Sequence, residues 1–199
     1  AFQNPTMLPW LSILDNVMIP LKIVEPFRQD YRRKRKGEFR ERAEALLEQV
    51  GLAGFGNKRP WQLSGGMLQR ASLCRALVHE PDILLLDEPF GALDQFTREE
   101  LWDTMQDLWI NRRPTVLLVT HDLRESAYLA SRICVMSSRP GRIIEDQRVT
   151  FARPRTLESS YQPDFTTLVQ QLRMSIAEAR APGSSQTPAA SRPLEEVSV

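Results

Sequence analysis

The chain has 199 residues, of which 42% are hydrophobic and 26% are charged, so a collagen-like, coiled-coil or disulfide-scaffold protein is excluded. Its 26 Lys and Arg residues and 25 Asp and Glu residues give a net charge of +1, so no overall electrostatic field favours nucleic acid or anionic lipid as a partner. No apolar run reaches the roughly 18 to 20 residues of a membrane span, and no secretion signal opens the chain. We therefore expect a chain that neither crosses a membrane nor is secreted.

The N-terminal stretch predicts a loop followed by a short helix. Prolines keep residues 4–9 out of a helix, and an apolar pattern then favours a helix that begins at Ser12 or Asp15 and stops at Pro20. A basic run covers residues 28–36. We interpret this run as a solvated loop or helix start rather than a nucleic-acid contact, because the remaining charge is balanced.

Two longer helices are predicted next. Residues 38–50 place apolar side chains on one face and charged side chains on the other, and Gly51 suits the position after the helix end. A second helix follows Ser64 and continues without a breaker until Pro81. The first part of the chain is therefore predicted to be mainly helical.

Strands and helices then alternate. The apolar runs over residues 83–86 and 115–119 are typical of strands buried on both faces of a parallel sheet. Residues 96–109 between them have helical period, so the three segments predict a βαβ unit with parallel strands. A helix over residues 123–130 and a strand over residues 133–136 continue the alternation, which makes the fold class α/β.

The C-terminal part predicts a hairpin and a tail. Residues 139–142 form a turn signal that leads into a short apolar pair, as in a hairpin. From residue 182 the composition shifts to Pro, Ser, Ala and Thr, which predicts a disordered tail over residues 182–199. The cysteines, Cys74 and Cys134, lie in apolar stretches without a CxxC motif, which indicates two buried thiols.

Two adjacent carboxylates, Asp87 and Glu88, end the apolar run at residues 83–86. Open α/β sheets place their ligand crevice at this strand end, where unused charge is costly. One carboxylate there can hold Mg²⁺ together with substrate phosphates, and its neighbour can accept a proton from an attacking water. We assign the metal to Asp87 and the water to Glu88. The alternative is an acidic strand end that caps a helix or pairs with arginine.

The segment Ser64, Gly65 and Gly66 opens a predicted helix. Serine suits the helix N-cap, and the two glycines let backbone N–H groups approach an anion closely, so the segment can bind phosphate. Taken alone, a Ser-Gly-Gly turn more often caps an ordinary helix.

His121 follows the strand at residues 115–119 by two positions. Because neighbouring parallel strands end together, we expect His121 to lie near Asp87 and Glu88. Its imidazole could then hydrogen-bond a γ-phosphate or the attacking water. The alternative is a lone histidine without a functional role.

Four motifs follow one another along the chain. They are LSGGMLQR at residues 63–70, ILLLDEP at 83–89, GALD at 91–94 and VTHD at 119–122. In this order and at these spacings they resemble the ATP-binding subunits of ABC transporters. The resemblance implies a P-loop NTPase-like parallel sheet core over about residues 72–150 with an inserted α-helical subdomain over about residues 11–71.

The resemblance also implies roles for site residues in a homodimer that binds ATP and Mg²⁺. Ser64, Gly65 and Gly66 would contact the γ-phosphate of an ATP held by the opposing subunit, and Asp94 would belong to the D-loop. Asp87 and Gln3 would contact Mg²⁺. The catalytic residues would be Glu88, the switch histidine His121 and Gln3, which would reach the attacking water.

One motif of this family does not occur in the 199 residues: there is no GxxxxGKS/T phosphate-binding loop. The family has that loop upstream of the position of Gln3. We therefore expect the first strands and the P-loop to precede Ala1, a partial ABC ATPase domain over residues 1–181, and a fragment that is inactive by itself.

Further likenesses concern the branch of the family. Methionine stands at residue 67, and residues 7–11 (MLPWL) and 137–143 (SSRPGRI) resemble the nitrate, sulfonate and taurine importers. The resemblance implies a subunit on the cytoplasmic face of the membrane that contacts permease subunits near residues 8–10, works indirectly with a solute-binding protein and binds no nucleic acid. The alternatives are a non-catalytic ABC-like subunit that docks on a permease or dimer partner, and an ABC ATPase of DNA repair or translation.

Overall fold

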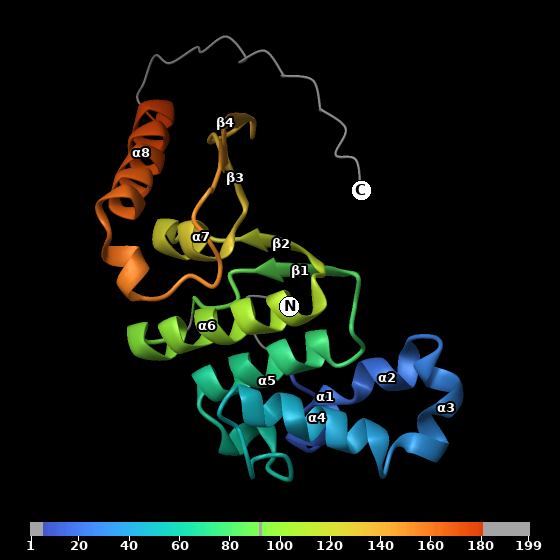
Figure 1. The fold of residues 1–199 in the computed structure, drawn as a ribbon. Helices are drawn as coiled ribbons and strands as arrows, with labels where there is room; N and C mark the ends of the chain where they lie inside the picture. The colour runs from blue at the N-terminus through green and yellow to red at the C-terminus, as the bar shows by residue number, and fades with distance from the viewer. Residues whose placement is uncertain (1–5, 92, 181–199) are drawn as a thin grey trace.

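The computed structural model describes residues 6–91 and 93–180. Helices alternate with two small sheets (Figure 1). The helices are α1 (Ile13–Val17), α2 (Ile19–Ile23), α3 (Phe27–Lys34), α4 (Glu38–Gln49), α5 (Gly65–Leu77), α6 (Gln95–Arg112), α7 (Leu123–Leu129) and α8 (Pro163–Arg180), with short 3-10 turns at Pro60–Gln62 and Glu158–Tyr161. The strands are β1 (Ile83–Asp87), β2 (Thr115–Val119), β3 (Arg132–Met136) and β4 (Ile143–Arg148).

The predicted βαβ unit is confirmed. Strands β1 and β2 pair in parallel, with Ile83 opposite Thr115 and Asp87 opposite Val119, and α6 connects them. Figure 1 shows α6 beneath this strand pair, α5 beneath α6, and α1 and α4 beyond α5. Because the two strands are parallel, their C-terminal ends, which carry the predicted site residues, lie at one edge.

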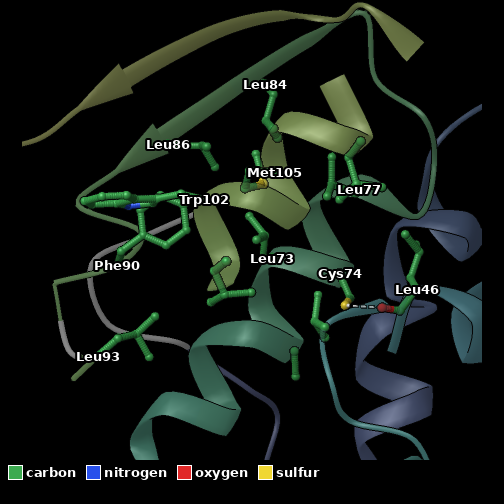
Figure 2. Close-up of a cluster of buried hydrophobic side chains, with 14 of the residues drawn as sticks. Leu46, Leu73, Cys74, Leu77, Leu84, Leu86, Phe90, Leu93, Trp102 and Met105 are labelled. Carbon is green, nitrogen blue, oxygen red and sulfur yellow. Dashed lines mark hydrogen bonds between the residues drawn. The ribbon is translucent and has the colours of Figure 1, made fainter. Parts of the chain in front are cut away.

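The core lies between β1 and the helices α5 and α6. Leu84 and Leu86 project from β1 towards α6, whose Trp102 and Met105 lie between the strand and α5 (Figure 2). All four side chains are less than 7% exposed. Alternate residues of β1 therefore anchor the strand on α6 through apolar burial.

The other face of the β1–β2 pair is exposed within the described residues. Ile83, Leu85 and Leu117 are 60–63% exposed, and Val119 is 54% exposed. The expectation of strands buried on both faces is therefore wrong for this part of the chain. The physical reason is that α6 covers one face, whereas the described ranges place no element over the other.

Strands β3 and β4 form an antiparallel pair that is separate from β1 and β2. The predicted hairpin is thus confirmed, and so are the helix and the strand that continue the alternation, although this strand pairs with β4 and not with β1 or β2. Helix α8, which the sequence analysis did not identify, packs against β3, β4 and α7. Its Phe165, Leu168 and Leu172 are buried at helical spacing.

The first helices differ from the prediction around Pro20. Pro20 does not stop a helix; it lies in the first turn of α2, where a missing N–H costs nothing. Helix α1 ends earlier, at Val17, and is capped by the Ser12 side chain, which accepts a hydrogen bond from Asp15 N. The basic run forms most of the exposed helix α3.

The two thiols have different environments. Cys74 is fully buried, and its Sγ donates to the carbonyl of Leu46 (Figure 2). Cys134 is exposed, contrary to expectation, because side chains of β3 alternate between its two faces. Both cysteines are free.

Within the described ranges, no helix combines the length and apolar character needed to cross a membrane. Residue 3 and the expected tail at residues 182–199 lie outside the described residues.

Candidate functional site

The C-terminal ends of β1 and β2 bring Glu88 and His121 together. The backbone N–H of Glu88 donates to Val119 O at 2.8 Å, which extends the β1–β2 pairing by one residue. Nδ1 of His121 lies 2.8 Å from Oε1 of Glu88. An ionised carboxylate only accepts hydrogen bonds, so Nδ1 is the donor of this pair whenever Glu88 is ionised. The strand-end argument therefore predicted this proximity correctly.

The turn after β1 is shaped around the Glu88 carboxylate. Glu88 has a φ of +43°, a left-handed conformation that is unfavourable for a residue with a Cβ. Gly91 N donates back to Glu88 O at 3.2 Å. A Cβ on Gly91 would lie 3.4 Å from Oε2 of Glu88, so the turn folds back to within van der Waals distance of the carboxylate. Such strained backbone conformations concentrate at functional sites.

Exposure differs sharply between the paired side chains. His121 is 76% exposed, whereas Glu88 is 26% exposed. The second ring nitrogen of His121 can therefore reach a ligand while Nδ1 stays on Glu88. Asp87, the last residue of β1, is also exposed at this strand end.

The N-terminus of α5 carries the Ser-Gly-Gly segment. Ser64 is the N-cap, and its Oγ accepts a hydrogen bond from Met67 N at 3.3 Å. A Cβ on Gly65 would meet nothing within 4 Å, whereas one on Gly66 would lie 3.0 Å from Cδ2 of Leu93. The helix-capping alternative thus describes Ser64 in this structure. The open side of Gly65 leaves the first N–H groups of α5 accessible to an anion.

Asp94 begins α6. Its carboxylate accepts a hydrogen bond from Thr97 N at 3.1 Å, and the hydrogen bonds from Thr97 hold the pKa of Asp94 below its usual value. Asp94 is therefore ionised at the N-terminus of α6, where the helix dipole favours a negative charge.

Contacts that the sequence did not predict link α5 and α6 to the loops that follow β1 and β2. Gln69 of α5 is buried, and its Nε2 donates to Pro89 O at 2.7 Å. Arg98 of α6 donates to Asp122 Oδ2 at 2.9 Å and to Leu93 O at 3.1 Å. Gln69 lies within the LSGGMLQR motif but was given no role in the sequence analysis, and nothing local marked Arg98.

The described residues contain no cluster of three or more His, Cys, Asp or Glu side chains that could hold a metal ion by itself. The carboxylates at the strand end could act only as part of a coordination shell completed by other groups. This fits Mg²⁺, which takes one or two carboxylates and completes its shell with waters and substrate phosphates.

Comparison with known proteins identifies the family of this chain. The family described as ABC transporter matches residues 1–91. The chain is 42% identical over 171 residues to the aliphatic sulfonates import ATP-binding protein SsuB of Bacillus licheniformis, covering 86% of this chain and 62% of that protein. It is 43% identical over 160 residues to the nitrate import ATP-binding protein NrtD of Synechococcus elongatus, covering 80% and 56%.

Two further likenesses extend the comparison. The taurine import ATP-binding protein TauB of Chromobacterium violaceum is 41% identical over 179 residues, covering 86% of this chain and 65% of that protein. A solved dimeric structure of the ATP-binding cassette MJ0796, bound to ADP and Pi, matches with a TM-score of 0.63 and 33% identity, covering 76% and 62%. The chain thus spans about three fifths of the length of these curated relatives.

The fold is similar to that of an ABC cassette, and the chain belongs to the ATP-binding subunits of ABC transporters. The relatives named above are import proteins for aliphatic sulfonates, nitrate and taurine.

Proposed function

We propose that this chain is the part of an ATP-hydrolysing subunit that carries the water-activating residues, and that the whole subunit energises import of a small solute such as a sulfonate, nitrate or taurine. The contact between Glu88 and His121 at the end of two parallel strands carries the proposal. The names of the relatives support the solute class.

Glu88 and His121 divide the work at the γ-phosphate. Glu88 is placed to accept a proton from the attacking water, and the turn at Gly91 packs beside its carboxylate. His121 donates through Nδ1 to Glu88, and its exposed second nitrogen can donate to a phosphate oxygen when the ring is charged. Gln3 would join them, as the family resemblance implies.

Mg²⁺ and ATP fit the groups that this part of the chain offers. Asp87 would hold Mg²⁺ from the strand end, with Gln3 as a second ligand, and the metal would neutralise the charge that develops on the transferring phosphate. The accessible N–H groups at Gly65 and Gly66 suit a phosphate anion. Ser64, Gly65, Gly66 and Asp94 would act on an ATP held by the opposing subunit of a homodimer.

Residues 8–10 are proposed as a contact with permease subunits. Trp10 is 67% exposed on a loop that is nevertheless fixed. The fully buried Asn16 accepts from Leu8 N at 2.7 Å and donates to Leu8 O at 3.1 Å, and Arg59 donates to Trp10 O at 2.5 Å. An exposed aromatic side chain on a rigid loop suits a protein interface.

The remaining assignments complete the proposal. Residues 11–71 act as the helical subdomain and residues 72–150 as the α/β core. The subunit lies at the cytoplasmic face of the membrane and receives its solute indirectly, from a solute-binding protein through the permease.

The test uses ATP hydrolysis. Because the 199 residues contain no GxxxxGKS/T motif, the assay compares the bare chain with a fusion that places a P-loop-bearing segment of an ABC ATPase before Ala1. We expect little hydrolysis by the bare chain, measurable hydrolysis by the fusion, and a loss of about 100-fold or more in the fusion with Glu88→Gln.

Two outcomes would overturn the proposal. Robust hydrolysis by the bare chain would show that the site does not need a P-loop. A folded fusion that binds ATP but hydrolyses none, with and without Glu88→Gln, would favour a non-catalytic subunit that docks on a permease or dimer partner.

A further inference from the structure

Arg98 joins two loops that flank the candidate site. Its Nη1 donates to Oδ2 of Asp122 at 2.9 Å, and its Nη2 donates to the carbonyl of Leu93 at 3.1 Å. Leu93 ends the loop that follows Glu88, and Asp122 directly follows His121. One guanidinium therefore contacts both segments that carry the paired site residues.

The Asp122 end of this link is itself well fixed. Oδ1 of Asp122 accepts from the backbone N–H groups of Arg124 and Glu125 at 2.9 and 3.1 Å, so the residue caps α7. Its own N–H donates to Oγ1 of Thr120 at 3.0 Å. The Asp122 carboxylate thus holds the first N–H groups of α7, the Asp122 backbone is tied to the Thr120 side chain across His121, and Arg98 binds the remaining carboxylate oxygen.

The Leu93 end of this link lies against the Ser-Gly-Gly segment at the start of α5. Leu93 is 6% exposed, and its Cδ2 lies where a Cβ on Gly66 would come within 3.0 Å. Gln69, one turn further along α5, donates to Pro89 O in the same loop. The loop from Glu88 to Leu93 is therefore held by α5 on one side and by Arg98 on the other.

The Arg98–Asp122 pair is partly buried, with side chains 26% and 27% exposed. Within the described residues, Nε of Arg98 is buried and has no hydrogen-bond partner. A half-buried pair that leaves a donor unsatisfied is a poor device for stability alone. Its geometry is instead suited to fixing the relative position of two loops, because the rigid guanidinium plane sets both contacts at once.

We propose that Arg98 is a positioning residue that holds the loop at Leu93 in register with His121 and Asp122, and so maintains the contact between His121 and Glu88. The importance of Arg98 for hydrolysis rests on the proposed function. The effect of Arg98 on the position of His121 is independent of that function, so the two effects can be tested separately.

The structural test uses the 199-residue chain and the imidazole resonances of its two histidines. The signals of His121 are assigned with His79→Gln, and a Glu88→Gln variant supplies the spectrum of a weakened His121 contact. We expect Arg98→Gln to move the His121 resonances towards that spectrum, and Asp122→Asn, which keeps a capping oxygen for α7, to do the same.

Three further variants sharpen this test. Arg98→Lys keeps the charge but cannot make both contacts with one rigid plane, so it should give an intermediate shift. The double variant Arg98→Gln/Asp122→Asn should shift the signals no more than either single change, because both remove one link. Arg40→Gln removes an exposed pair with Glu44 of the same length, 2.9 Å, and should leave His121 unchanged.

The kinetic test uses the fusion protein. Arg98→Gln should lower kcat by about tenfold and change KM for ATP by less than about twofold, since misplacing reacting groups slows the chemical step. Unchanged His121 resonances in both Arg98→Gln and Asp122→Asn, in proteins that still melt cooperatively, would overturn the proposal. An inactive fusion with shifted His121 resonances would overturn the proposed function and leave the positioning role supported.

Discussion

Oε1 of Glu88 lies 2.8 Å from Nδ1 of His121, although 33 residues separate the two in sequence. The parallel register of β1 and β2 creates this contact, since Asp87 is opposite Val119 and each site residue follows its strand end closely. Glu88 reaches this position with a left-handed backbone. The pair therefore combines an exact register with local strain, and both can be tested.

The strained backbone predicts a conflict between stability and activity at residue 88. Glu88→Gly should raise the free energy of unfolding by about 0.5–1 kcal/mol, because glycine adopts a φ of +43° without a steric cost. Hydrolysis by the fusion should be lost in the same variant. The matched control is Asp87→Gly in the extended β1 strand, which should lower stability instead. Urea unfolding measures the stability of the Glu88→Gly and Asp87→Gly variants. A destabilised Glu88→Gly protein would contradict the strain argument.

Adjacent glycines at the start of α5 should respond differently to alanine. Gly65→Ala adds a methyl group where nothing lies within 4 Å, so stability should stay the same or rise slightly. Gly66→Ala should be less stable than Gly65→Ala by about 1 kcal/mol, because its methyl group meets Leu93 at 3.0 Å. Thermal or urea unfolding of the two variants measures the difference.

A partner change checks the cause of that difference. In the Gly66→Ala background, Leu93→Ala should cost less than in the unchanged chain, because it also relieves the overlap. Strictly additive effects of the two substitutions would show that Gly66 and Leu93 do not interact.

Glu125 predicts a pH dependence of stability. Burial raises its pKa from 4.5 to about 7, and the residue is only 3% exposed. The folded chain therefore holds this proton more tightly than the unfolded chain between about pH 4.5 and 7. Over that window the contribution of Glu125 to stability falls as pH rises, by up to about 1.4 kcal/mol per pH unit.

The variant Glu125→Gln isolates this contribution from those of the other carboxylates. The gain in stability of Glu125→Gln over the unchanged chain should grow from pH 4.5 to 7 and then level off, as measured by urea unfolding at each pH. A difference that is constant across this range would show that Glu125 does not retain its proton on folding.

The thiols should differ in reactivity. Burial raises the pKa of Cys74 to about 12, and its sulfur is fully enclosed, so it should not react in the folded chain at pH 8. Cys134 is exposed on β3 and should react with a maleimide. Mass spectrometry should find one label on the native chain, at Cys134, and two labels after denaturation. Native labelling at Cys74 would contradict the packing of α5 against Leu46.

Local patterns determined most of the elements. The period of the apolar residues predicted α4, α6 and α7, and the β-branched run at residues 115–119 predicted β2 with the bounds that the structure shows. Helix α8 was missed even though Phe165, Leu168 and Leu172 follow helical spacing. Pro20 was misinterpreted, because proline stops a helix only away from its first turn.

The candidate site was predictable as far as strand geometry reaches. Parallel strands end at the same edge, so the sequence by itself determined that Glu88 and His121 would be neighbours. The ordered motifs determined the family, because each one is a short contiguous segment with its own spacing. Both inferences depend on residues close together in the chain or on a rule that holds for every parallel pair.

Tertiary packing alone decided the rest. It paired β3 with β4 rather than with the parallel strands, and it left one face of β1 and β2 exposed in the described part of the chain. It also placed Leu93 against Gly66 and Arg98 between Leu93 and Asp122. These contacts join side chains from different elements, and their geometry depends on how whole helices pack, which no local pattern of residues encodes.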